Sequence, residues 1–144
     1  MSPSSDPGDG PRIALLGAPV EVGASQRGTL MGPAALRTAG LAAVLESLGF
    51  RVEDHGDLSV ADLVPANDTP PPNTRHYGEI AASIRALSAR AYALANSGAI
   101  PVFLGGDHSL SMGSVNGVAR HWHAQGREQF VLWLDAHADR KSVV

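Results

Sequence analysis

Short apolar runs alternate with longer segments in which apolar residues recur every three or four positions. The short runs are typical of buried strands, and the longer segments are typical of helices with one apolar face. Strand and helix therefore alternate along most of the chain. The predicted strands are residues 13–16, 50–54, 100–104 and 130–134, and the predicted helices are 32–49, 77–97 and 109–123.

This alternation predicts an α/β protein with a parallel sheet and right-handed crossovers. The runs 100–104 and 130–134 are almost wholly apolar, as expected for parallel strands covered on both faces. Pro33 suits the first turn of a helix, while Gly49 and Gly98 suit helix ends. No internal repeat or linker divides the chain, so we expect one domain.

Composition narrows the class of protein. The chain has 144 residues, 44% of them hydrophobic, and a net charge of -3, which gives no electrostatic footprint for nucleic acid or a membrane surface. No apolar stretch approaches the roughly 18 residues that span a bilayer. The absence of cysteine excludes disulfides and thiolate metal sites. Residues 1–11 are expected to be a disordered lead-in without signal-peptide features, and the protein to be cytoplasmic.

The strongest candidate for chemistry follows directly on the predicted strand 130–134. Asp135, His137 and Asp139 occupy alternate positions, and alternate side chains of an extended segment share one face. These three side chains could converge on one spot. Carboxylate and imidazole donors suit manganese, iron, zinc or magnesium, with Mn²⁺ a natural choice for a mixed oxygen and nitrogen set.

A second candidate, His108, follows the predicted strand 100–104 after Gly105, Gly106 and Asp107. Ligands of parallel sheets bind at the carboxyl ends of the strands, so both candidates are expected at one edge. Either motif alone is more often an ordinary turn or strand end, but the two together favour a metal site. Asp107 is predicted to form the turn or orient the histidine and not to bind metal. Two metal ions sharing a carboxylate can generate hydroxide for hydrolysis near pH 7.

Other polar features carry less weight. His121 and His123 are two positions apart on a predicted helix and do not face each other. The loop 17–28 lacks the glycine and lysine spacing of phosphate-binding loops. Arg37 is first part of a helix start and only second a contact site.

The motifs 105–110 (GGDHSL) and 135–139 (DAHAD) resemble the manganese-binding signatures of the ureohydrolase family, which includes arginase and agmatinase. Segments 17–19, 27–28, 32–41, 54–58 and 113–117, together with Trp133, are similar to arginases in particular. The resemblance covers residues 12–139. It implies a three-layer α/β/α fold with a parallel sheet, truncated here after about four strands, and leaves 140–144 as a non-matching tail.

The resemblance implies manganese-dependent hydrolysis of the guanidinium of L-arginine to L-ornithine and urea, as in arginine metabolism and the urea cycle. His108 would ligate one of two manganese ions and His137 the other, with Asp135 bridging. Asp139 would bind the first ion and pass a proton to the departing amine. Full-length members are expected to form trimers or hexamers. Only four of the family's six ligand positions occur in residues 1–144, so we expect no activity from this chain alone.

Two alternatives stay open. The chain could represent an agmatinase or another amidine hydrolase, because residues 140–144 do not match the loop in which substrate choice would be read. It could also be a non-catalytic fragment that binds metal weakly or associates with intact subunits. An open sheet edge would then favour aggregation, so we expect poor solubility or partial unfolding.

Overall fold

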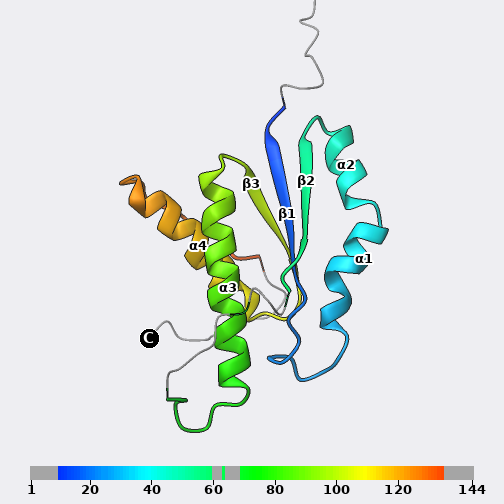
Figure 1. Ribbon diagram of the computed structural model, residues 1–144. Coiled ribbons are helices and arrows are strands. Elements are labelled where there is room, and N and C mark those ends of the chain that lie inside the picture. Colours follow the sequence, from blue (N-terminus) through cyan, green and yellow to red (C-terminus); the bar gives the residue numbers. More distant parts are fainter. Residues whose placement is uncertain (1–9, 60–62, 64–68, 135–144) are drawn as a thin grey trace, which may run out of the picture.

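The fold is a parallel sheet between two layers of helices, seen here in a computed structural model that describes residues 10–59, 63 and 69–134. Helices α1 and α2 cover one face of the sheet, and α3 and α4 cover the other (Figure 1). The predicted three-layer α/β/α fold is confirmed. The strands, in the order β2-β1-β3, and the helices are β1 (Arg12–Ala18), β2 (Arg51–Asp57), β3 (Ile100–Gly105), α1 (Gly32–Thr38), α2 (Leu41–Ser47), α3 (Tyr77–Asn96) and α4 (Leu110–Ala124).

The middle strand, β1, pairs with both other strands. Ile13 stands opposite Val52 of β2 and Ile100 of β3, and all strands run parallel. The chain moves from β1 to β2 and then back across β1 to β3, so right-handed crossovers place the connecting helices on opposite faces. The helices that follow β1 and β3 therefore lie on different layers. The carboxyl ends of β1 and β3 meet where the connections diverge, which is where parallel sheets form ligand crevices.

The hydrophobic core lies between β1 and the α3 layer. Leu16 of β1 and Leu87 of α3 are almost completely buried and belong to one cluster with Leu94 and Ala99. The predicted apolar stripe of α3 accounts for this packing, because its residues recur at helical spacing. Helix α4 packs along α3. Together these two helices seal one face of the sheet.

The opposite layer differs from the single helix predicted over 32–49. A short 3₁₀ turn, η1 (Thr29–Met31), leads into α1, and the helix is interrupted before α2. Gly40 adopts a left-handed conformation with φ of 87°, which breaks the α-helical hydrogen-bond pattern and which glycine adopts without steric cost. The single-helix prediction was wrong for that reason. Leu36, Val44 and Leu48 on this layer remain exposed.

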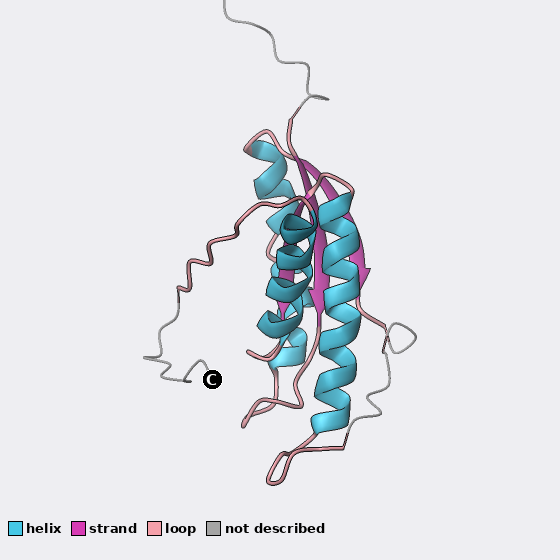
Figure 2. Cartoon of the chain, turned by 90° about the vertical axis from the view of Figure 1, so that its left-hand side faces the viewer, coloured by secondary structure: helices cyan, strands magenta, loops and turns pink. Residues whose placement is uncertain are grey.

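The predicted strand 130–134 was also wrong, since these residues form no regular secondary structure. A strand requires a neighbouring edge for its backbone hydrogen bonds, whatever its side chains favour. Among the described residues β3 pairs only with β1, and 130–134 runs as a loop outside the sheet (Figure 2). The other edge of β3 stays unpaired among the described residues, so an edge is available but 130–134 does not pair with it.

The predicted lead-in and tail fall mostly outside the described residues. Within the described part, the carbonyls of Gly10 and Pro11 accept hydrogen bonds from Arg51, each at 3.0 Å, which ties the approach to β1 to the start of β2. None of the helices in the described part is long and apolar enough to cross a membrane.

Candidate metal centre

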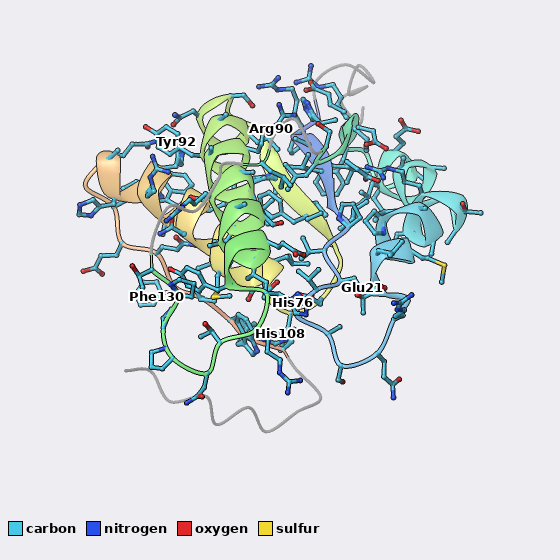
Figure 3. The ribbon with its side chains drawn as sticks, turned by 60° about the horizontal axis from the view of Figure 1, so that its bottom comes forward. Glu21, His76, Arg90, Tyr92, His108 and Phe130 are labelled. Carbon is cyan, nitrogen blue, oxygen red and sulfur yellow. The ribbon has the colours of Figure 1, made fainter. Side chains whose placement is uncertain are left out.

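His108 lies just beyond the end of β3, on the carboxyl edge of the sheet. Its side chain is exposed, and Figure 3 shows it near this edge, to which Glu21 also belongs through the loop after β1. The other three predicted ligands, Asp135, His137 and Asp139, lie outside the described residues. His108 is thus the one predicted ligand whose position the structure describes.

Asp107, beside His108, joins the loops that follow β1 and β3. Its backbone N–H donates to the Val20 carbonyl at 2.8 Å, and its Oδ2 accepts from the Gly23 N–H at 2.7 Å. Its Oδ1 accepts from the Ser109 N–H at 2.9 Å and from the Ser109 hydroxyl at 2.5 Å. The side chain is buried, with 6% exposed. The prediction that Asp107 forms the turn is confirmed.

Gly106 lets the two loops approach each other. A Cβ at this position would lie 2.4 Å from the Ala18 carbonyl oxygen and 2.8 Å from the Val20 nitrogen. Those atoms belong to backbone that cannot move aside cheaply, so a side chain is excluded. The glycine pair before Asp107 therefore has a packing role as well as forming the turn.

The loop after β1 is closed by its own hydrogen bonds. The Gly28 N–H donates to the Glu21 carboxylate, and the Thr29 hydroxyl donates to the Val20 carbonyl at 3.3 Å. Sequence reasoning dismissed a phosphate-binding role for this loop but did not predict its contact with Asp107. No local pattern signals that contact, because Gly23 and Asp107 are far apart in the sequence.

Trp133 brings the segment that precedes Asp135 to His108. The ring centroids of Trp133 and His108 are 5.1 Å apart, and the planes are inclined by 49°. Sequence reasoning missed this contact. The available signal was the position of Trp133 two residues before Asp135, because alternate residues of an extended segment share one face.

A second electrostatic cluster lies at the carboxyl end of β2. Arg37 of α1 binds both oxygens of Asp54, at 2.7 and 2.9 Å, and also donates to Asp57 at 2.5 Å. The hydrogen bonds from Arg37 hold the pKa of the Asp54 carboxyl below its usual value, against a smaller desolvation effect, and Asp54 and Asp57 raise the pKa of Arg37. Arg37, predicted to be only secondarily a contact residue, connects α1 to β2.

The remaining histidines of α4 behave as predicted. His121 is buried, and its Nδ1 lies 2.6 Å from the side-chain oxygen of Asn96, whereas His123 is exposed. Within the described residues, no group of three metal-binding side chains gathers at one point. A cleft of about 350 Å³ beside the carboxyl edge is lined by Val20, Glu21 and Glu79 among others, and His108 is not part of its lining.

Comparisons with known proteins agree on one family. The model of the arginase family matches residues 11–143. The arginase of Agrobacterium fabrum is 50% identical over 125 residues, which cover 87% of this chain and 38% of that protein. Arginase-1 of Rattus norvegicus is 39% identical over 127 residues, covering 88% of this chain and 38% of that protein.

The structural comparison agrees with the sequence comparison. The crystal structure of arginase from Bacillus cereus matches with a TM-score of 0.67 and 31% identity, over 78% of this chain and 36% of that one. The chain thus spans less than two fifths of the length of these relatives.

Proposed function

Because the chain belongs to the arginase family, we propose that it carries part of a manganese centre that hydrolyses the guanidinium of L-arginine to L-ornithine and urea. The ligands it would supply are His108, Asp135, His137 and Asp139. The observation that carries the proposal is the contact between Trp133 and His108. It brings the segment that precedes the second motif against the first motif.

The geometry of the described residues supports this assignment. Asp135 follows Trp133 by two positions, and two residues span at most about 7 Å of extended chain. The proposal therefore needs only a short length of chain between the ring contact and the second motif. The proposed ligands offer two imidazole nitrogens and carboxylate oxygens and no thiolate. This donor set suits Mn²⁺.

His108 and Asp139 have different roles in the proposed reaction. His108 would offer a neutral imidazole nitrogen to metal, held on a loop that the hydrogen bonds of Asp107 fix to the loop after β1. When bound, manganese supplies a Lewis acid that lowers the pKa of water toward neutrality. We assign to Asp139 a proton transfer: its carboxylate would accept a proton from the attacking water and then deliver it to the departing amine nitrogen, which makes the amine a better leaving group.

Residues 1–144 should bind Mn²⁺ without releasing urea. Four donors can hold an ion, whereas the resemblance implies six for a working pair of ions. The expected substrate is L-arginine, and the guanidinium is a poor electrophile, so turnover should need the complete set.

The test is a titration of the purified chain with Mn²⁺, in which electron paramagnetic resonance measures the free and bound ion. It is carried out on the wild type and on the His108→Ala and Asp139→Asn variants. Each substitution should weaken Mn²⁺ binding by about tenfold or more, because His108→Ala removes one donor of a small set and Asp139→Asn replaces an anionic donor by a neutral one. Urea release from L-arginine is measured on the same samples and should be absent.

The control is His123→Ala, which removes another exposed histidine that lies away from the carboxyl edge, near the far end of α4. It should bind Mn²⁺ as the wild type does. If His108→Ala bound Mn²⁺ with the same affinity as the wild type, the assigned ligand set would be contradicted. Manganese-dependent urea release would contradict the expected inactivity of residues 1–144.

A further inference from the structure

Trp133 lies on the inner side of an extended segment. Val131 and Trp133 are about half exposed, at 53% and 49%, while Phe130, Leu132 and Leu134 are 82–90% exposed. Side chains at alternate positions therefore face opposite ways, as in extended chain. Val131 and Trp133 line one shallow cavity with Met112 and Val115 of α4, among others. The inner face of this segment is directed at α4 and at His108.

The contact with His108 is between two rings from distant parts of the chain. Aromatic rings attract each other when their centroids are about 4.5–7 Å apart, and the Trp133–His108 pair falls in this range at 5.1 Å. His108 has an exposed side chain at the start of a loop. An indole placed against it limits the orientations of the imidazole.

We propose that Trp133 is a positioning residue for the His108 imidazole in the manganese centre, and this inference rests on the proposed function. Trp133 contributes no ligating atom. It restricts the ring of His108 before metal arrives, so less conformational freedom is lost when the nitrogen binds an ion. Groups that orient a metal-bound histidine typically contribute 10–100-fold to metal affinity, and Trp133 fills this position with a ring in place of a hydrogen-bonding carboxylate.

The chain contains a matched control pair. His121 and Trp122 of α4 also form a ring contact, with centroids 4.6 Å apart, and Arg127 covers the Trp122 ring at 4.4 Å. This pair lies near the opposite end of α4, and the sequence has only these two tryptophans. Trp122→Phe therefore leaves Trp133 as the single tryptophan, and Trp133→Phe leaves Trp122.

The experiment uses the full chain, with MnCl₂ as the probe. In Trp122→Phe, Mn²⁺ should quench the emission of Trp133, because the ion binds next to the ring that Trp133 contacts. In Trp133→Phe, the emission of Trp122 should not respond to Mn²⁺. In the Mn²⁺ titration followed by electron paramagnetic resonance, Trp133→Ala should weaken Mn²⁺ binding about tenfold. Trp133→Phe should keep most of the wild-type affinity, because a ring remains.

A structural readout separates positioning from general destabilisation. In the metal-free chain, Trp133→Ala should shift the nuclear magnetic resonances of the His108 ring protons and leave those of His121 in place. Far-ultraviolet circular dichroism should be unchanged, because Trp133 lies outside the helices and the sheet.

The outcomes are distinguishable. If the wild type bound Mn²⁺ and Trp133→Ala bound it with the same affinity, the inference would be overturned and the proposed function would stand. Absence of Mn²⁺ binding by the wild-type chain would overturn the proposed function and this inference together. Unshifted His108 resonances in Trp133→Ala would overturn the ring contact itself.

Discussion

At the scale of single residues, Asp107 organises the candidate centre. Its carboxylate accepts three hydrogen bonds and is almost completely buried. Burying a carboxylate is costly unless its oxygens are satisfied, and here both loops at the carboxyl edge satisfy them. The position of His108 therefore depends on a neighbouring residue that need not touch metal.

Replacing Asp107 by alanine should destabilise the chain by roughly 1.5–3 kcal/mol, because the Gly23 and Ser109 N–H groups lose a charged acceptor. Urea denaturation followed by circular dichroism measures the loss. Asp107→Asn keeps one oxygen acceptor and should lose less. Equal stability of the alanine variant and the wild type would show that water replaces the carboxylate at no cost.

The pairing of Arg37 with Asp54 should make stability depend on pH. The pKa of Asp54 is lowered in the folded chain, so its contribution is present above the ordinary aspartate value of about 3.9 and is lost as the pH falls through the lower folded value. Asp54→Asn should cost about 1 kcal/mol at pH 7, since solvent screens these partly exposed groups. The difference from wild type should shrink progressively below about pH 4 in urea denaturation.

The exposed pair of Arg12 and Glu53, 3.3 Å apart, is the matched control for that measurement. It has a single contact and no bidentate geometry, so Glu53→Gln should cost a few tenths of a kcal/mol at most. A loss at pH 7 in Asp54→Asn that persists undiminished at pH 3 would argue against a charge effect.

At the scale of elements, the packing of α4 on α3 depends on small residues. A Cβ on Gly117 would lie 2.4 Å from the Ser88 carbonyl oxygen and 2.5 Å from the Ala91 Cβ. Gly117→Ala should destabilise the chain by about 1–3 kcal/mol through overpacking, which outweighs a gain of up to about 1 kcal/mol in helix propensity. Thermal unfolding measures the balance.

Gly78 in the first turn of α3 is the contrasting position, because nothing lies within 4 Å of a Cβ there. Gly78→Ala should leave the melting temperature unchanged or raise it slightly. If both alanine variants raised it, the close approach of the two helices would be disproved.

The elements also show what local sequence can predict. The stripe of α3 and the apolar run of β1 follow from period and composition, because the structure buries their apolar side chains. The apolar run of β3 also forms a strand, but only its Leu104 is fully buried. The interruption at Gly40 was visible as a glycine inside a helical pattern but was outweighed by the leucines on either side. The failure at 130–134 has a different cause, since hydrogen bonding between strands depends on what lies alongside and not on the strand itself.

The candidate site divides in the same way. His108 and the turn-forming role of Asp107 could be predicted, because glycine and aspartate after an apolar run are local signals. The contacts of Asp107 with Gly23, and of Trp133 with His108, depend on segments that only the fold brings together. The assignments of Asp135, His137 and Asp139 remain predictions.

At the scale of the whole molecule, the outer side of segment 130–134 is left uncovered. Its outward side chains, Phe130, Leu132 and Leu134, are almost fully exposed, and an uncharged extended run of this kind is prone to pair with other chains. Leu132→Lys should raise the concentration at which the chain stays monodisperse in light scattering, because charge opposes such pairing.

Val44→Lys on α2 is the control, since that valine is 55% exposed but lies in a helix. It should improve solubility less. An equal improvement from both substitutions would indicate that general surface polarity, and not the extended segment, governs association.

The central position of β1 has a consequence for how the chain is made. β1 is synthesised first, yet its partner β3 is encoded near the other end of the described chain, with Ile13 opposite Ile100. At a translation rate of about 5–20 residues per second, β1 waits several seconds on the ribosome before β3 exists. During that time Leu15 and Leu16, which end as the largest fully buried side chains of the strand, have only β2 and the nascent helices beside them. The central strand of the finished sheet is therefore the one whose apolar side chains most need protection from aggregation during synthesis.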